Sequence, residues 1–471
     1  MPLRPATHEA YELLQRGCIA MADIEAAGIR IDTDYLDKAI DDVCGRIKQA
    51  EAELRETDLY KLWQKHYGST MKLDATGQLA HIVFKVMGCR RSLYHEQDKN
   101  DEIAYKHLIS DIPELSKHFE ARKLRKALTG NLYGIKKETV NGYIHPFFDL
   151  HTVESYRSSS SRINFQNQHV RNKLIAQIVR SCVIPRNKGN VLLEMDYGAQ
   201  EVRVSVCYNK DPVLRDYIVN DGDMHRDMAK ELYILTDEQL GPSDKGPGKL
   251  VRYAAKNKFV FPGFYGSDYI SCAPNLWDAI TELDLKRADG VSMHEHLAEN
   301  GINRLGLCDR DTTPASDSFE KHVKAVEHDY WYNRYSVYTQ WKKDWWNLYN
   351  RQGGVNTLTG FRLFGIFRRT QILCDPIQGS AFHCLLWSVI HIQEEFRKRK
   401  MRAKIICQIH DSALVDCPQS ELSDVIEIMH RWSVREVSKH WSWITVPLAT
   451  EFELAKDNWY NKKTIDINLP C

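Results

Sequence analysis

The sequence has few of the features that mark secreted, membrane or zinc-binding proteins. Its twelve cysteines are scattered and form no C-x-x-C pair, which argues against a zinc site and for reduced thiols in a cytosol-like compartment. No apolar signal-peptide stretch opens the chain, and the longest apolar runs, such as residues 385–392, are too short to cross a bilayer. We therefore expect a cytoplasmic protein without membrane contact.

An excess of charge of either sign is also missing. The formal net charge is +1 over 471 residues, so no whole-chain field favours nucleic acid, and any basic footprint must be local. What the chain does have is a hydrophobic fraction of 43% with 10% aromatic residues, which is typical of a folded protein. Its length allows several subdomains, each with its own core.

Two aspartates stand at the ends of short apolar runs. Residues 191–196 predict a buried strand that ends at Asp196, with helical character after it. Residues 404–417 predict strand, tight turn and strand, with Asp411 at the hairpin tip. Each aspartate alone is more typical of a turn or cap residue. Brought together from distant strands, they match the carboxylate pair of a two-metal phosphoryl-transfer centre, and Mg²⁺ prefers such oxygen ligands.

A basic and aromatic segment lies between these aspartates. Arg252 and Lys256 are four residues apart, so they share one face of a helix that we expect to begin near Leu250. Two fixed cations match the β- and γ-phosphates of a nucleoside triphosphate, whereas the alternative is a solvated surface helix. The aromatic residues that follow are too apolar for a solvent face, and one of them could stack on an incoming base. They are Phe259, Phe261, Phe264 and Tyr265.

The first third of the chain is predicted to be mostly helical. One helix should end at Gly28, and Thr33 should be the N-cap of the next. Apolar residues then recur at helical spacing at Leu36, Ile40, Val43, Ile47 and Leu54. A basic stretch follows at Arg122, Lys123, Arg125, Lys126, Lys136 and Lys137. Such a run is more typical of a solvated helix face, with a grip on a DNA backbone as the alternative.

Two later segments differ in character. Residues 284–318 are polar and turn-rich, and we expect an insertion with little regular core. Residues 330–349 predict one long amphipathic helix. Its aromatic stripe favours core packing over base stacking. The stripe consists of Trp331, Tyr335, Tyr338, Trp341 and Trp345.

Several segments resemble the motifs of the family A DNA polymerases, the DNA polymerase I type, and they occur in the family's order. Residues 196–203 (DYGAQEVR) resemble motif A, residues 252–266 the fingers helix of motif B, and residues 408–411 (QIHD) motif C. Residues 157–167 (RSSSSRINFQN), 224–225 (MH) and 375–379 (DPIQG) resemble the family's Arg…Asn-Leu-Gln-Asn, Asp-Ile-His and Pro-Ile-Gln-Gly segments. Each match is modest, but the ordered set is specific and covers almost the whole chain.

The resemblance implies a metal centre and a triphosphate site. Two Mg²⁺ ions would be bound by Asp196, Asp411 and the backbone carbonyl of Tyr197. The triphosphate would be held by Arg252, Lys256 and His225. Lys256 is also a candidate general acid for the leaving pyrophosphate.

The resemblance also implies contacts with the sugar, the base and the DNA. Glu201 would be the steric gate that rejects a ribose 2′-OH, and Tyr265 would belong to the dNTP site. Contacts near the primer end would come from Arg157, Gln166, Asn167 and Gln378, with His410 at the primer terminus. Contacts in the minor groove sense duplex geometry, because base identity is degenerate there.

Motif B departs from the family by one extra residue. The steps from Arg252 through Lys256 and Phe261 to Tyr265 are four, five and four residues, where the family has steps of four. We expect a π-bulge to absorb the extra residue, since Pro262 removes a backbone donor in that turn. This register assigns base stacking to Phe261, with Phe259 as the alternative.

Motifs A and C depart by substitution. Ser412 stands where motif C usually has Glu, which leaves two aspartates as the metal shell. Gly198-Ala199-Gln200 replaces the usual Ser-Gln-Ile of motif A, but the gate Glu201 is present. A preference for deoxynucleotides is therefore expected.

The implied fold is the α+β right-hand polymerase fold, with an antiparallel-sheet palm and a helical thumb and fingers. We expect the palm at 1–32, 141–207 and 356–471, the thumb at 33–140, and the fingers at 208–355, including the 284–318 insertion. Because only residues 1–32 precede the thumb-like helices, we expect no 3′–5′ exonuclease domain. The layout resembles phage enzymes, so the compartment would be the host cytoplasm.

The function implied is template-directed addition of dNTPs to a primer 3′-OH, with primer–template DNA as partner. A separate exonuclease or processivity factor is an open alternative for a further partner. Two other functions are weighed. A metal-dependent nuclease also uses paired carboxylates but has no use for a triphosphate-binding helix. A catalytically impaired DNA-binding relative would fit Ser412, but not the presence of both Asp196 and Asp411.

Overall fold

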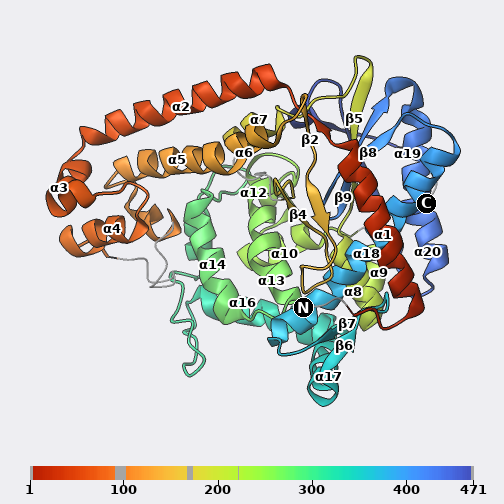
Figure 1. Ribbon diagram of the computed structural model, residues 1–471. Helices are drawn as coiled ribbons and strands as arrows, with labels where there is room; N and C mark the ends of the chain where they lie inside the picture. Colours follow the sequence, from red (N-terminus) through yellow and green to blue (C-terminus); the bar gives the residue numbers. More distant parts are fainter. Residues whose placement is uncertain (1–3, 91–101, 167–172, 221, 468–471) are drawn as a thin grey trace.

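The computed structural model describes residues 4–90, 102–166, 173–220 and 222–467. Figure 1 shows a strand layer with covering helices, a long helical arm, and a second group of helices. One hydrophobic cluster joins the sheet to the base of the arm, a second fills the second group of helices, and a third fills the outer part of the arm. The chain therefore builds more than one core, as its length predicts.

The strand layer is a five-stranded antiparallel sheet in the order β11-β10-β5-β9-β8. Its middle strand β5 (Asn190–Tyr197) is buried from Val191 to Met195, and it pairs with β9 (Ser412–Pro418). A two-residue turn joins β9 to β8 (Lys404–Ile409). The other two strands are β10 (Thr450–Ala455) and β11 (Lys463–Ile465). The predicted strand before Asp196 and the predicted hairpin are confirmed.

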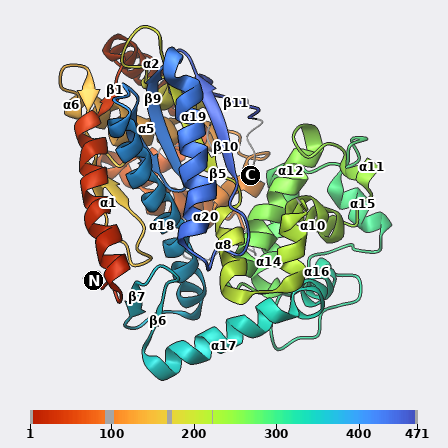
Figure 2. The ribbon, with the colours of Figure 1, turned by 90° about the vertical axis from the view of Figure 1, so that its right-hand side faces the viewer.

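Helices cover one face of this sheet. The 30-residue α18 (Arg369–Lys398) is buried along most of its length and packs on α1 (His8–Ala27) and α8 (Gln200–Asn209). Figure 2 shows α18 with α19 (Leu422–His430) and α20 (Val437–His440) over the strands.

The end of α1 is fixed by Gly28. Its φ is +67°, and a Cβ at this position would lie 2.5 Å from the ring of His145. Only glycine fits both the backbone conformation and the close approach. The predicted helix end at Gly28 is confirmed.

A helical arm extends from the sheet, with α2 (Thr33–Arg55) and α5 (Glu114–Ala127) side by side (Figure 1). All five predicted apolar positions of α2 are buried, which confirms its period. The rest of the arm comprises α3 (Asp58–Tyr67), η1 (Gly68–Thr70), α4 (Thr76–Ala80), η2 (His81–Val86), η3 (Glu102–Leu108), η4 (Leu128–Leu132) and α6 (Tyr133–Glu138).

The N-cap of α2 is Asp32, so the prediction of Thr33 is wrong by one residue. Asp32 has an extended backbone, and its carboxylate accepts a hydrogen bond from the amide of Tyr35 at 2.9 Å. Thr33 is already the first helical residue. Both residue types cap helices well, so the sequence alone did not distinguish the two positions.

Much of the basic stretch in the arm is paired with acidic side chains. Arg125 contacts Glu51 at 3.1 Å and also Asp74. Further pairs are Lys117–Glu53 at 2.6 Å, Lys123–Glu102 at 2.6 Å and Lys136–Asp37 at 2.8 Å. These pairs cross between elements of the arm, so several of its cations neutralise the arm itself.

The second group of helices stands beside the sheet (Figure 2). Its core includes Phe259, Phe319 and Tyr338, all fully buried. The group consists of α9 (Pro212–Val219), α10 (Met224–Tyr233), α11 (Asp237–Leu240), α12 (Gly246–Ala255), η5 (Lys256–Val260), α13 (Phe261–Phe264), α14 (Tyr269–Glu282), α15 (Met293–Glu299), α16 (Phe319–His328), η6 (Asp329–Arg334) and α17 (Ser336–Gln352). The basic helix α12 begins four residues before the predicted Leu250.

The segment 284–318 has more core than expected. Leu285, Met293 and Leu297 are buried in the hydrophobic cluster of the second helix group, and Met293 and Leu297 lie on α15. The prediction of little regular core is therefore wrong. The apolar residues of this segment are isolated among polar ones, so no helical period stood out.

The aromatic stripe packs in the core, as predicted, with Trp331, Tyr335 and Tyr338 buried. The single helix expected over residues 330–349 is instead divided into η6 and α17. They meet at Tyr335, whose ψ of 50° leaves the helical range. A change of backbone angle at one residue leaves the spacing of the stripe almost unchanged, so the pattern did not reveal it.

Short ladders and helices complete the fold. The ladders pair β1 (Ile29–Arg30) with β2 (Tyr143–Ile144), β3 (Phe147–Asp149) with β4 (Ser159–Ser161), and β6 (Gly354–Asn356) with β7 (Arg362–Phe364). The remaining helices are α7 (Lys173–Arg180), η7 (Gln419–Glu421), η8 (Arg431–Glu436) and η9 (Trp459–Asn461). Within the described ranges, no helix is long and apolar enough to span a membrane.

The cap assignment of α2 can be tested by mutation. Asp32→Ala removes the acceptor of the Tyr35 amide and should cost about 1 kcal/mol, which corresponds to roughly fivefold faster hydrogen exchange in the first turn of α2. Thr33→Ala is the matched control and should change the exchange rate little. A larger effect from Thr33→Ala would return the cap to Thr33.

Candidate active site

The sheet brings Asp196 and Asp411 together. Asp196 is the second-last residue of β5, directly opposite Ser412 at the start of β9. Asp411 is the second residue of the turn between β8 and β9. The amide of Tyr197 donates to the backbone carbonyl of Asp411 at 3.3 Å, which ties the end of β5 to this turn. The two predicted aspartates therefore meet at one edge of the sheet.

The two carboxyl groups repel each other's charge. Burial, followed by the negative charges of Asp411 and Glu194, raises the pKa of Asp196 to about 8. Burial also raises the pKa of Asp411, although Arg157 opposes the shift. Both aspartates are thus held where ionisation is unfavourable unless a positive charge compensates.

This site fits a hard cation. The Oδ1 atom of Asp196 is buried and has no hydrogen-bond partner in the described part of the chain. An unsatisfied carboxylate oxygen beside a second carboxylate is suited to Mg²⁺, which takes oxygen ligands and keeps several waters. The described residues contain no group of three or more His, Cys, Asp or Glu side chains arranged to hold a metal. The candidate donors are this pair and nearby backbone oxygens, and Glu451 stands opposite Asp196 on β10.

Ser412 contributes to the turn itself. Its side chain is buried, and its hydroxyl donates to the carbonyl of Ile409 at 3.0 Å. This bond crosses the base of the His410–Asp411 turn. The hydroxyl thus closes the hairpin that carries Asp411.

Buried amides support the same turn. Gln166 donates to Ser158 at 2.7 Å and to Gln408 at 2.8 Å, and Gln408 donates to the carbonyl of His410 at 2.7 Å. Ser158 donates to Gln408 at 2.5 Å. Gln166 is only 8% exposed and Gln408 is fully buried. Sequence reasoning assigned no role to Ser158, and a serine within a polar run gives no signal of this position.

The other predicted DNA contacts lie near this turn. Arg157 contributes to the electrostatic field at both His410 and Asp411. His410 itself is exposed and has a φ of +53°. Gln378 is half-buried and hydrogen-bonds with Tyr265. Asn167 lies outside the described residues.

The predicted cations lie on the segment that faces this edge. Arg252 is on α12, and Lys256 begins η5 one turn later. Burial and the charge of Arg252 lower the pKa of Lys256, while Asp411 and Asp196 oppose the shift. The ammonium therefore lies within electrostatic reach of both aspartates.

Arg252 is paired with Asp223 at 2.8 Å, a contact that sequence reasoning missed. Asp223 also caps α10 by accepting from the amide of Arg226 at 3.0 Å. The sequence does carry one signal for Asp223: it stands two residues before His225 and so completes the Asp-x-His pattern of the family segment.

The extra residue of the basic segment is absorbed in a π-helical turn, as predicted, at η5. This turn separates two phenylalanines. Phe259 is 1% exposed and packs edge-on against Tyr330 in the core. Phe261 is half-buried, with its ring centroid 5.5 Å from that of His225 and 5.1 Å from Lys256 Nζ. Of the two alternatives, only Phe261 lies beside the predicted cations.

His225 lies at the wall of a cavity of about 330 Å³ that also involves Arg203, Tyr217, Asp223 and Arg252. Burial, Lys256 and Arg252 lower the pKa of His225 to about 4, so its ring is neutral at neutral pH. The Nδ1 atom is buried without a hydrogen-bond partner among the described residues. The cavity thus combines two arginine side chains with a neutral imidazole.

Glu201 connects two parts of the molecule. Its carboxylate accepts from Arg157 and from the hydroxyl of Tyr265. Burial and Glu201 raise the pKa of Tyr265, so its hydroxyl stays protonated and remains a donor. The carboxylate therefore joins the basic segment to Arg157.

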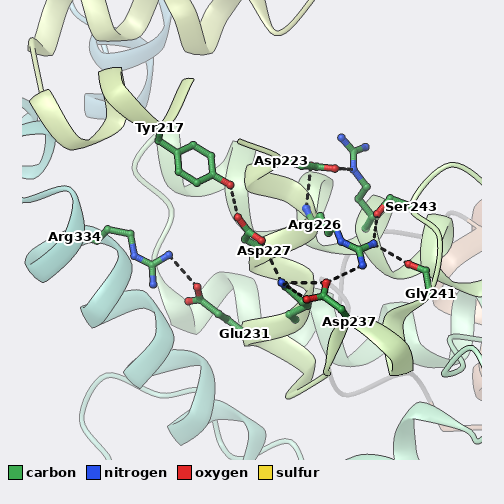
Figure 3. Close-up of polar contacts among 11 residues, drawn as sticks. Tyr217, Asp223, Arg226, Asp227, Glu231, Asp237, Gly241, Ser243 and Arg334 are labelled. Atoms are coloured by element: carbon green, nitrogen blue, oxygen red, sulfur yellow. Dashed lines mark hydrogen bonds and ion pairs between the residues drawn. The ribbon is translucent and has the colours of Figure 1, made fainter. Parts of the chain in front are cut away.

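The position of α10 is fixed by the polar network in Figure 3. Arg226 donates to the carbonyl of Gly241 at 2.7 Å and forms an ion pair with Asp237 at 2.8 Å. Arg334 pairs with Glu231 at 2.9 Å, which ties α10 to η6. Since His225 precedes Arg226, this network also positions the cavity wall.

Most of the chain matches a known protein family. A family model described as DNA polymerase family A matches residues 43–265 and 323–461. The unmatched residues 266–322 include α14 and α15. The matched residues include both aspartates, the basic segment and the Asp-x-His segment.

The chain is similar to the DNA polymerase of Bacillus phage SP01, with 22% identity over 91% of this chain and 45% of the relative. It is also similar to DNA polymerase I of Bacillus subtilis, with 23% identity over 97% of this chain and 46% of the relative. The chain thus spans about half the length of these relatives.

A solved structure of the polymerase domain of M. smegmatis Pol1, in complex with DNA primer-template and dNTP, matches with a TM-score of 0.72. The match has 17% identity and covers 95% of this chain and 70% of that one. It confirms the predicted α+β polymerase fold. Because the family model matches well over half of the residues, the chain belongs to DNA polymerase family A.

Proposed function

We propose that the chain is a template-directed DNA polymerase that adds dNTPs to a primer 3′-OH. The observation that carries the proposal is the carboxyl pair of Asp196 and Asp411, which the strand register brings together and whose charges both act on Lys256. A carboxylate pair opposite a cationic helix suits a nucleoside triphosphate with its metal ions, because the carboxylates bind the metal ions and the cations bind the phosphates. The structurally similar polymerase domain of M. smegmatis Pol1 was solved with primer-template and dNTP, which supports the same substrates for this chain.

Asp196, Asp411 and the carbonyl of Tyr197 would hold two Mg²⁺ ions in this proposal. When bound, such ions activate the attacking hydroxyl and stabilise the leaving oxygen. The support is the unsatisfied Oδ1 of Asp196 and the raised pKa of both aspartates. Ser412 supplies no carboxylate but keeps Asp411 in place through the closed turn.

Arg252, Lys256 and His225 would bind the triphosphate. Arg252 must then leave Asp223, its present partner, so the phosphate would replace a carboxylate. Lys256 would also protonate the leaving pyrophosphate, and its lowered pKa supports a role as general acid. Phe261 would stack on the incoming base, and Tyr265 would hold Glu201 as the gate against a ribose 2′-OH.

Arg157 and Gln378 would contact the duplex in the minor groove, and His410 the primer terminus. Gln166 would act differently from the sequence-based expectation, because its amide protons are already donated to Ser158 and Gln408. We assign Gln166 to holding the Asp411 turn rather than to reading DNA. Asn167 keeps its proposed DNA contact from the family resemblance alone.

The domain roles belong to the same proposal. The palm would comprise 1–32, 141–207 and 356–471, the thumb 33–140, and the fingers 208–355. Movement of the fingers onto a correct base pair would provide selectivity by induced fit. The bond from Tyr265 of the fingers to Glu201 of the palm supports such coupling.

One observation favours a second candidate, a DNA-binding relative without catalysis, namely the absence of a carboxylate at Ser412. The full chain with a 5′-labelled primed template, Mg²⁺ and dNTPs separates the candidates. Primer extension supports the polymerase, and a gel shift without extension supports the binder. Shortening of the primer would instead identify a metal-dependent nuclease.

The metal shell can be tested with two adjacent substitutions. Asp411→Asn should reduce extension on the order of a thousandfold or more, because it removes a charge that the metal site needs. Ser412→Ala removes only the bond to Ile409 and should stay within a few-fold of wild type in kcat. Equal losses from both substitutions would show that the two-aspartate shell is wrong.

The stacking residue can be tested in the same way. Phe261→Ala should raise KM for the dNTP about tenfold, since base stacking contributes roughly 1–3 kcal/mol. Phe259→Ala should instead lower the free energy of unfolding by about 3–5 kcal/mol, because its ring fills the core. Steady-state kinetics and denaturation measure both. The reverse ranking in KM would exclude this register.

The gate can be tested by sugar discrimination. Glu201→Ala should increase the relative kcat/KM for ribonucleotides by about tenfold or more, because the carboxylate no longer opposes the 2′-OH. Tyr265→Phe keeps the carboxylate but removes its tyrosine donor, so its effect should be smaller. Single-nucleotide extension with dNTP and rNTP measures the ratio. An unchanged ratio in Glu201→Ala contradicts the assignment.

A further inference from the structure

A lysine is buried behind the proposed nucleotide site. Lys342 of α17 is 8% exposed, whereas its neighbour Lys343 is exposed. Burying an ammonium is costly unless specific partners compensate for the lost water. The site chemistry described above makes no use of Lys342, so its burial needs a separate explanation.

The partners of Lys342 are aromatic rings and one backbone carbonyl. Its Nζ lies 3.9 Å from the ring centroid of Trp331 and 4.9 Å from that of Tyr338, both distances typical of cation–π contacts. It donates to the carbonyl of Gly263 at 3.4 Å. Burial lowers the pKa of Lys342 to about 7, and of the nearby charged groups Glu327 favours the ammonium and Arg369 opposes it.

Gly263 belongs to α13, the short helix that carries Phe261. The last carbonyls of a helix lack their usual amide partners, so side chains often satisfy them. The carbonyl of Gly263 accepts from the amide of Gly266 at 3.1 Å, and α17 adds two side-chain donors, Lys342 to Gly263 and the hydroxyl of Tyr338 to the carbonyl of Phe264 at 2.9 Å. Both side-chain bonds reach α13 from the core side.

The fit between α13 and this support is close. A Cβ on Gly263 would lie 2.9 Å from Nε1 of Trp331, so the backbone rests directly on the indole. Tyr338 is itself fixed, because its amide donates to Asp211 at 3.0 Å. α13 therefore rests on a packed surface that is formed by α17 and η6.

The residues on either side of these carbonyls point toward the proposed active site. Phe261 contacts His225 and Lys256, and Tyr265 donates to Glu201. A shift of the carbonyl of Gly263 would move both side chains, since they flank it within one turn. The contacts of α17 with α13 thus determine where the side chains of Phe261 and Tyr265 lie.

We propose that Lys342, together with Tyr338, is a positioning residue that sets where the Phe261–Tyr265 segment meets an incoming nucleotide. The inference rests on the proposed function for its kinetic consequence, but not for its structural one. Lys342 would touch no substrate. It acts only through the backbone of α13.

The test uses Lys342→Met, which keeps most of the length of the side chain but removes the amino group, with Lys343→Met as the matched control on the same helix. Lys342→Met should raise KM for the dNTP about tenfold with kcat within about twofold, as expected for loss of one buried hydrogen bond and its cation–π contacts. It should also speed amide hydrogen exchange at Tyr265 and Gly266, whose amides bond within this turn. Lys343→Met should change neither quantity.

Unchanged exchange at Tyr265 and Gly266 in Lys342→Met would overturn the inference, as would equal effects from Lys343→Met. A loss of kcat at constant KM would also overturn it. If Lys342→Met does not fold, Tyr338→Phe replaces it, since that substitution removes only the hydroxyl bonded to Phe264. If wild type extends no primer, the proposed function fails, and hydrogen exchange alone decides whether Lys342 positions α13.

Discussion

The antiparallel pairing of β5 with β9 is the constraint on which the site depends. It places Asp196 opposite Ser412, and therefore next to the turn that carries Asp411. A slip of one residue would send Asp196 to the other face of the sheet. The register is protected by the buried run of β5 and by the amide relay from Gln166 to the carbonyl of His410. The electrostatic conflict between the aspartates follows directly from this geometry.

The second helix group completes the site by bringing positive charge to the carboxyl pair. Two features make this arrangement work. The π-helical turn at η5 buries Phe259 and leaves Phe261 beside Lys256, and the bond from Tyr265 to Glu201 connects the segment to the sheet side. α17 supports the same segment from behind through Lys342 and Tyr338. The sheet, η5 and α17 thus meet around the short helix α13 to form the candidate site.

Sequence patterns predicted those parts of the fold that depend on residues close together in the chain. The strand before Asp196 and the hairpin at Asp411 were predictable, because apolar runs and turn chemistry are written along the chain. The extra helical residue was predictable only by comparison with the spacing of the family motif. The contacts of Gln166 with Gln408 and of Lys342 with Gly263 were not predictable, because they join residues far apart in sequence. The division of the aromatic stripe at Tyr335 and the core of residues 284–318 were missed because neither changes the residue pattern clearly.

The paired cations of the arm affect how salt would act on nucleic-acid binding. A protein gains affinity for DNA when its cations displace condensed counterions, and the salt dependence counts the phosphates so neutralised. Lys117, Lys123, Arg125 and Lys136 already have carboxylate partners. Each of these cations would have to leave its carboxylate partner before it could bind a phosphate and release a counterion. Under the proposed function, these four cations would therefore add little to the salt dependence of DNA binding.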